Sequence, residues 1–65
     1  MTVPKTNVKV KLIGKEGNAF AILGAVSKAL RQAGHAELAK QYMTEAIAGD
    51  YDHLLQVTMN YVEVE

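Results

Sequence analysis

The sequence predicts a small α+β domain with the element order β-α-α-α-β, and three observations support this. Segments near the two ends of the chain alternate between apolar and charged side chains, which is typical of half-buried strands. Two longer segments between them carry apolar residues at helical spacing, and a glycine follows each. The charges of the two alternating segments are opposite, which favours their pairing. We therefore expect a helical hairpin and a short third helix, packed on a two-stranded sheet of the chain termini.

The length and composition allow one domain that needs additional stabilisation. The chain has 65 residues with no internal repeat or linker, so residues 1–65 form a single unit with a short arm at residues 1–6. It contains no cysteine, which excludes disulfides and thiolate metal sites. A domain of this size is only marginally stable alone. We therefore expect a homodimer.

The two strands are predicted at residues 7–13 and 60–65. In the first, Lys9 and Lys11 alternate with apolar residues, and in the last, Glu63 and Glu65 do so. Pairing of the two segments would place these lysines opposite or diagonal to the glutamates. The intervening valines, Val8, Val10, Val62 and Val64, would then face the helices. The polarity of the pairing stays open.

The helical hairpin is predicted from caps and apolar periodicity. The first helix is expected over residues 19–33, with Asn18 as its N-cap and Gly34 as the glycine that ends it. The second is expected within residues 35–48, with Gly49 as its C-terminal stop. Only one or two residues separate the helices, so they should pack side by side.

The third helix is predicted over residues 51–59, with Asp50 as its N-cap. Residues 57–61 fit a strand as well as a helix because Val57, Met59 and Tyr61 alternate. Two aromatic residues, Phe20 and Tyr42, lie on or beside the apolar stripes of the first two helices. We expect both of them in the core.

The glycine loop between the first strand and the first helix is a candidate anion site. Its ligands would be Lys15, Gly17 and Asn18, at the positive end of a helix. The loop lacks the longer glycine pattern and the final Gly-Lys-Ser/Thr of a P-loop, and Glu16 would repel phosphate. We therefore expect a turn and a cap without bound phosphate, and no cofactor.

Metal-binding and catalytic patterns are weak. Potential metal ligands follow each helix break: His35 and Glu37 follow the first, and Asp50, Asp52 and His53 follow the second. The two histidines lack the close helical spacing of known zinc motifs. Capping explains the two aspartates, so no metal site is expected. Catalysis is not expected either, because the chain has no cysteine nucleophile and little volume to enclose a pocket.

A ridge of small residues along the first helix is the most informative feature. Four alanines recur every four positions, with Gly24 beside them, which lets another backbone approach closely. The ridge can pack against the second helix of the same chain, against a second chain, or against both, and we favour both. The residues predicted for the dimer interface are Ala21, Gly24, Ala25 and Lys28.

Charge and hydropathy indicate the partners and the cellular compartment to expect. Seven basic and seven acidic residues give a net charge of zero. Nonspecific nucleic-acid binding needs an excess of Lys and Arg on one face, so the composition argues against this function. The longest apolar run, residues 19–23, is too short to span a membrane. Residues 1–5 lack the apolar core of a signal peptide. We therefore expect a cytoplasmic protein without a membrane partner.

The chain resembles a family of short proteins encoded by bacteriophages and integrated elements. The residues that carry the resemblance are Gly17-Asn18-Ala19-Phe20, Ile22, Ala29-Leu30, Gly34, Glu45-Ala46, Gly49-Asp50-Tyr51-Asp52, Leu54-Leu55 and Val62-Glu63-Val64-Glu65. The resemblance implies an accessory protein in the cytoplasm of a bacterial host. It transfers no functional residue, because the family has no assigned activity.

The expected function is non-enzymatic protein binding by a homodimer. The partner would be a host protein, and inhibition of a bacterial defence protein is one role that the resemblance suggests. The alternative is a binder of a small anionic ligand, a nucleotide or a nucleic acid through Lys15, Lys28 and Arg31.

Overall fold

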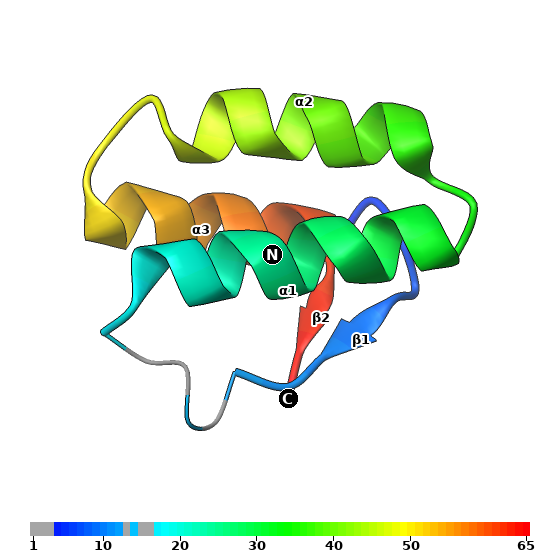
Figure 1. The fold of residues 1–65 in the computed structure, drawn as a ribbon, viewed down its shortest axis with the longest axis horizontal. Coiled ribbons are helices and arrows are strands. Elements are labelled where there is room, and N and C mark those ends of the chain that lie inside the picture. Colours follow the sequence, from blue (N-terminus) through cyan, green and yellow to red (C-terminus); the bar gives the residue numbers. More distant parts are fainter. Residues whose placement is uncertain (1–3, 13, 15–16) are drawn as a thin grey trace.

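The computed structural model describes residues 4–12, 14 and 17–65, and it confirms the predicted α+β fold. Three helices lie side by side, and two strands made by the chain ends lie beneath them (Figure 1). The elements in chain order are β1 Lys9–Val10, α1 Ala19–Gln32, α2 Ala36–Ala46, α3 Tyr51–Tyr61 and β2 Glu63–Val64.

The two strands pair in parallel, as the only sheet of the described residues. Lys9 lies opposite Glu63, which confirms the predicted pairing of the two chain ends. The direction follows from the segment that precedes β1. The Lys5 N–H donates to the carbonyl of Asn60 (2.9 Å), so this segment is held at the end of α3, where β2 also begins. Both strands therefore start at the same place and run away from it.

The strands are shorter than predicted, and α3 is longer. α3 continues to Tyr61 because Leu54, Thr58 and Tyr61 are all buried at helical spacing. This periodic burial overrides the alternation that also fits a strand. The valines differ in their burial: Val10 and Val62 are buried as predicted, but Val64 is 40% exposed, because it lies at the end of the short sheet.

The caps of α1 are those that the sequence predicts. The Asn18 side-chain oxygen accepts from the Ala21 N–H (3.1 Å). Gly34 adopts a left-handed φ of 86°, and the next N–H, of His35, donates to the Leu30 carbonyl (2.8 Å). This is the geometry of a glycine-terminated helix. It turns the chain directly into α2.

Gly49 does not end α2 as predicted. The helix ends at Ala46 with Ile47 as its C-cap, and Gly49 has no left-handed φ. The reason for a glycine here is space, because a Cβ atom would lie 2.7 Å from the ring of His53. The His53 ring lies against Gly49, and its Nε2 donates to the carbonyl of Glu45 (2.8 Å), one of the last carbonyls of α2.

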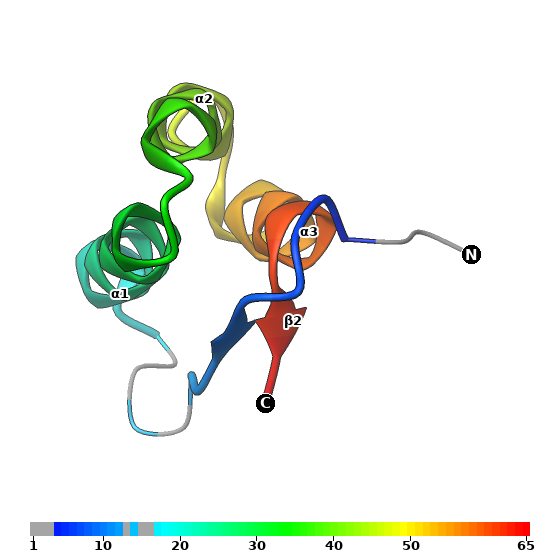
Figure 2. The same cartoon turned by 90° about the vertical axis from the view of Figure 1, so that its right-hand side faces the viewer.

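The core lies between the three helices and β1. Viewed end on, the helices occupy the corners of a triangle, with the strands below α1 and α3 and with β1 nearer to α1 (Figure 2). α1 packs against α2 and β1, and α2 packs against α3. The largest fully buried side chains are Tyr42, Tyr61, Ile22, Leu30, Val26, Val62 and Thr58.

Candidate functional site

The residues predicted for a dimer interface line one groove, between α1 and β1. Ala21, Gly24, Ala25 and Lys28 form its wall on α1, together with Ala29. Lys9, Val10 and Lys11, in and directly after β1, form the other wall, and Gln32 closes one end. We call this hollow of about 530 Å³ the edge groove.

The small-residue ridge of α1 lines the edge groove with Ala21, Gly24, Ala25 and Ala29. Gly24 is exposed, and a Cβ atom placed there would meet no described atom within 4 Å. The residues that α1 buries are Ile22, Leu23, Val26, Ser27 and Leu30. Ala25 and Ala29 of the ridge also pack against the core from their partly buried sides. The ridge leaves room for another backbone.

β1 presents a free backbone edge to this groove. The carbonyls of Val8 and Val10 accept from the N–H groups of Glu63 and Glu65 in the β2 segment (2.8 Å each). Backbone groups of successive strand residues point to opposite sides. Those of Lys9 therefore point away from β2, and among the described residues none pairs with them.

A second surface is apolar and surrounds Phe20. Phe20 is 86% exposed, which contradicts its predicted place in the core, and Ile47 is 65% exposed. Between them lies a hollow of about 340 Å³ lined also by Ala19, Leu23, Ala46, Gly49, Asp50, Tyr51 and Leu54. We call Phe20, Ile47 and these lining residues the Phe20 surface.

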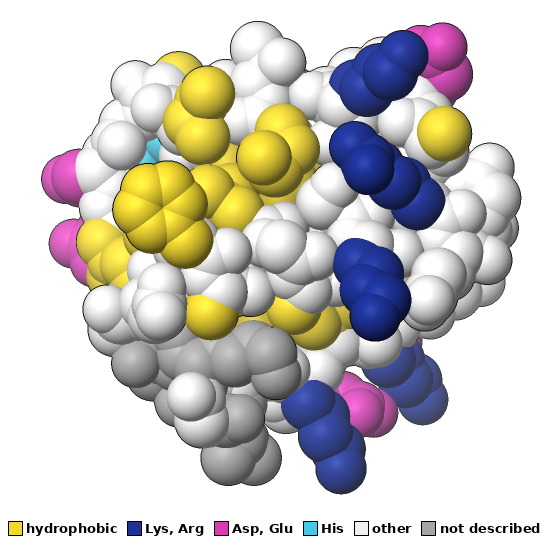
Figure 3. Space-filling model, viewed as in Figure 1, with side chains coloured by type: hydrophobic (Ala, Val, Ile, Leu, Met, Phe, Trp, Pro, Cys, Tyr) yellow, Lys and Arg dark blue, Asp and Glu magenta, His cyan; other side chains and the backbone are white. Residues whose placement is uncertain are grey.

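Hydrophobic and basic side chains occupy different parts of one face of the molecule. Hydrophobic side chains gather on one side of this face, whereas Lys and Arg side chains form a row along the other (Figure 3). The neighbours of Phe20 along α1 could have revealed its exposure. Positions four and eight residues later lie on the same helix face, and they hold Gly24 and Lys28, which are both exposed. Nothing comparable in the sequence marks Ile47.

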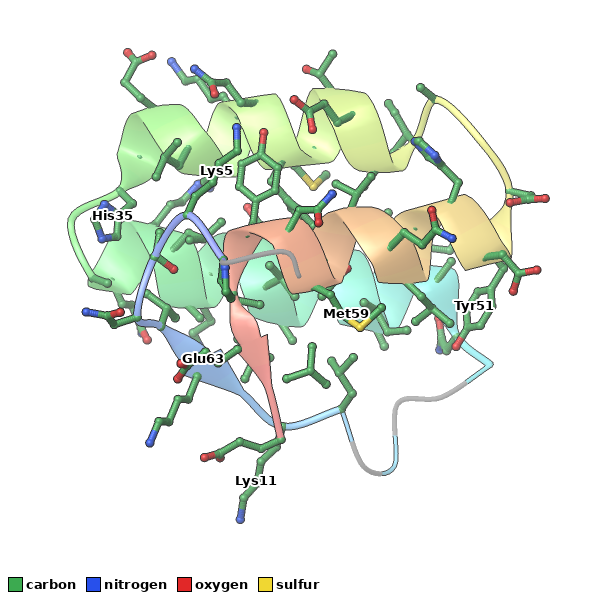
Figure 4. All side chains as sticks on the ribbon, turned by 180° about the vertical axis from the view of Figure 1, so that it is seen from behind. Lys5, Lys11, His35, Tyr51, Met59 and Glu63 are labelled. Carbon is green, nitrogen blue, oxygen red and sulfur yellow. The ribbon has the colours of Figure 1, made fainter. Side chains whose placement is uncertain are left out.

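The glycine loop has a structural role at the residues described. The Gly17 N–H donates to the hydroxyl of Tyr51 at the start of α3 (2.7 Å), and Asn18 caps α1. Figure 4 shows Tyr51 at this end of α3, beside the loop. Two of the proposed anion ligands therefore already have partners within the chain. The third, Lys15, lies outside the described residues.

The potential metal ligands are not brought together. Within residues 4–12, 14 and 17–65, no group of three His, Asp or Glu side chains is placed to hold a metal ion. Asp50 accepts from the His53 N–H (2.9 Å) and so caps α3 as predicted. His35 is the N-cap residue of α2, whereas His53 bonds to the Glu45 carbonyl near the other end of that helix.

A small polar cluster lies in the core between α2 and α3. The Thr58 hydroxyl donates to the Leu54 carbonyl and accepts from the hydroxyl of Tyr42 (2.8 Å each). Burial raises the pKa of Tyr42, and its hydrogen bond with Thr58 lowers that pKa in part. The cluster fixes the packing of the two helices.

The Tyr61 hydroxyl is different, because it is buried without a hydrogen-bond partner among the described residues. Burial, followed by the nearby Glu45 carboxylate, raises the pKa of Tyr61 to about 12. The Glu45 carboxylate raises this pKa first as an acceptor close to the hydroxyl, although outside hydrogen-bond geometry, and then through its negative charge. The Lys5 ammonium lies 4.9 Å from the centre of the Tyr61 ring and covers it.

None of the described helices has the length and apolar character needed to cross a bilayer. The comparisons with known proteins assign no family: no family model matches the chain, no curated protein is significantly similar to it, and no solved structure matches its fold. The resemblance to short phage proteins therefore stays a prediction.

Proposed function

We propose that this chain is a non-enzymatic protein that acts by binding other proteins, and that it forms a homodimer through the Phe20 surface. The observation that carries the proposal is the exposure of Phe20 (86%) and Ile47 (65%) beside one apolar hollow. Contiguous exposed apolar residues of this kind mark interaction surfaces. Buried aromatic side chains are also the residues that contribute most to binding at such surfaces.

A second copy of the chain is the partner that this surface fits best. Two-fold symmetric interfaces use the same patch on both chains, so the patch must be complementary to itself. The Phe20 surface carries a protruding aromatic ring and a hollow next to each other. A two-fold axis between them would place each Phe20 in the hollow of the other chain. Burial of one phenylalanine contributes about 1.5–3 kcal/mol.

The edge groove is a poorer dimer interface than the sequence predicts. Its walls carry Lys9, Lys11 and Lys28, and a symmetric contact would bring these lysines of two copies together. Like charges that meet across an interface oppose association. The Phe20 surface has Asp50 as its one charged lining residue among those described. We therefore assign the dimer to the Phe20 surface and leave the groove for another partner.

The biological setting rests on the resemblance alone. It suggests a phage or mobile-element protein that acts in the cytoplasm of a bacterial host, where the dimer would bind a host protein. Inhibition of a defence protein is one such role.

The alternative, an anion or nucleic-acid binder, has one supporting observation, which is the row of Lys and Arg side chains (Figure 3). Lys28 and Arg31 both belong to α1. Stacking of bases would also need an exposed aromatic ring beside these charges. The edge groove has no aromatic lining residue among those described, and the exposed ring of Phe20 lies on α1 about 12 Å along the helix from Lys28.

Sedimentation equilibrium of single-residue variants tests the proposed dimer. We expect the wild-type chain to sediment as a dimer of the 7.1 kDa chain at micromolar concentration. Phe20→Ser should weaken the dimer at least about tenfold, because it removes the aromatic ring from the interface. Met59→Ser is the matched control, since Met59 is 52% exposed on the outer side of α3 (Figure 4).

The control should keep the wild-type dissociation constant, and circular dichroism should show both variants folded. A wild-type chain that stays monomeric would contradict the proposal. Equal effects of the two substitutions would also contradict it.

A further inference from the structure

We propose that the edge groove binds an extended, acidic segment of a partner protein, which adds to the free edge of β1 as a third strand. The inference rests on the proposed function only in that the chain acts by binding proteins. It uses a different surface from the dimer. Each surface can therefore be tested by itself.

The first argument is the free edge itself. The carbonyls of Val8 and Val10 and the N–H of Leu12 all bond to residues of the β2 segment. Because these groups alternate along a strand, the N–H and carbonyl groups of Lys9 and Lys11 face the groove. An extended peptide can pair with such donors and acceptors by adding a strand to the sheet.

The second argument is the space beside that edge. A strand that is added to a sheet lies about 4.8 Å from its neighbour, so it needs a free volume next to β1. The opposite wall of the groove consists mainly of residues with small side chains or none, and Lys28 and Gln32 are its longer ones: Ala21, Gly24, Ala25, Lys28, Ala29 and Gln32. The hollow beside them has a volume of about 530 Å³. The small residues therefore explain how a backbone can fit between α1 and β1.

The third argument is charge, which identifies the occupant. Lys9, Lys11 and Lys28 line the groove, and none of its described lining residues is acidic. On the other side of β1, Glu63 of β2 lies opposite Lys9, so an acidic residue already faces this lysine across the sheet. Figure 4 shows that Lys11 and Glu63 project from the same outer side of the sheet. A segment in which glutamate or aspartate alternates with small apolar residues would match the groove in the same way.

The other occupants fit less well. Two copies of β1 cannot pair edge to edge without bringing Lys9 and Lys11 of both chains together, which is destabilising. A nucleic acid would match the lysines, but its backbone has no N–H donors to satisfy the Lys9 and Lys11 carbonyls. An acidic strand provides both carboxylates for the lysines of the groove and backbone partners for the N–H and carbonyl groups of Lys9 and Lys11.

Fluorescence anisotropy with a labelled, capped peptide of alternating valine and glutamate tests this inference on the full chain. The same peptide with glutamine in place of glutamate is the control for charge, and an oligonucleotide of the same net charge is the rival ligand. We expect binding of the acidic peptide, at least about tenfold weaker binding of the glutamine peptide, and no preference for the oligonucleotide. Amide shifts at Lys9 and Lys11 in NMR spectra would place the peptide at this edge.

Two variants separate the backbone edge from charge. Lys11→Ala removes the charge and keeps the N–H, whereas Lys11→Pro removes both and leaves the bonds of Val10 and Leu12 to β2 in place. The proline should weaken binding at least about tenfold more than the alanine does. Gly24→Leu should also abolish binding, because it fills the groove, and it should not unfold the chain since that space is empty.

Phe20→Ser should leave peptide binding unchanged, so that loss of the dimer and loss of the peptide are distinguishable. Equal binding of the acidic and glutamine peptides would overturn the inference. So would tighter binding of the oligonucleotide, or equal effects of Lys11→Ala and Lys11→Pro. Loss of the dimer in Gly24→Leu would show that a second copy occupies the groove and would also overturn it.

Discussion

Two tyrosines lie side by side in the core, but their hydroxyl groups have different environments. The rings of Tyr42 and Tyr61 meet edge to face with 5.5 Å between their centres. Tyr42 shares a hydrogen bond with Thr58, whereas the Tyr61 hydroxyl is buried without a partner among the described residues. An unpaired buried hydroxyl opposes folding, while a paired one contributes modestly to stability.

The two Tyr→Phe variants should therefore have opposite effects. Tyr42→Phe should lower the free energy of unfolding by about 1 kcal/mol, because it removes the bond to Thr58. Tyr61→Phe should raise it by about 1 kcal/mol, because it removes a desolvated hydroxyl. Urea denaturation measures both, and each variant is the control for the other. A loss of stability in Tyr61→Phe as large as that in Tyr42→Phe would show that its hydroxyl has a partner.

Stability should also fall at alkaline pH. The pKa of Tyr61 is raised from 10.0 to about 12, first by burial and then by Glu45. Between these values the unfolded chain has lost this proton and the folded chain still holds it, so rising pH favours unfolding. The contribution is complete below pH 10 and is lost as the pH rises through 12.

Thermal unfolding at several alkaline pH values checks this dependence. The melting temperature of Tyr61→Phe should decline less steeply above pH 10 than that of the wild-type chain. Identical slopes would show that another group causes the decline.

Two glycines give a further prediction at this scale. Gly49→Ala would place a Cβ atom 2.7 Å from the His53 ring, so the ring must shift and lose its bond to the Glu45 carbonyl. The free energy of unfolding should fall by about 1–2 kcal/mol. Gly24→Ala is the matched control. It meets no described atom and should raise stability by about 0.5–1 kcal/mol.

At the scale of the elements, the helices are more predictable than the strands. Asn18, Gly34 and Asp50 act through local backbone geometry, so the sequence alone reveals the ends that they cap. The end of α3 depends on the burial of Tyr61 between helices, which is a tertiary contact. Alternation along residues 57–61 cannot show that contact.

The candidate site is predictable in part for the same reason. The small residues of α1 are visible in the sequence, and the structure brings Ala21, Gly24 and Ala25 to one groove. What they face is not predictable, because it depends on where β1 lies relative to α1. The sequence places Phe20 in the core because aromatic residues near an apolar stripe usually lie there. The surface around it depends on Ile47, which follows the end of α2.

At the scale of the whole molecule, the two surfaces serve two different partners in this proposal. A dimer formed through the Phe20 surface adds apolar burial to a chain of only 65 residues, which is otherwise marginally stable. It leaves both edge grooves open, one on each chain. A dimer with two grooves would bind a partner that carries two acidic segments more tightly than one chain does.

The most direct test of the central claim is an isotope-filtered NMR experiment on a mixture of labelled and unlabelled chains. It detects only contacts between different copies. We predict contacts from the Phe20 ring of one copy to the methyl groups of Leu23 and Leu54 that line the hollow of the other. Contacts between copies that involve Ala25 of the edge groove, with none from Phe20, would contradict the claim.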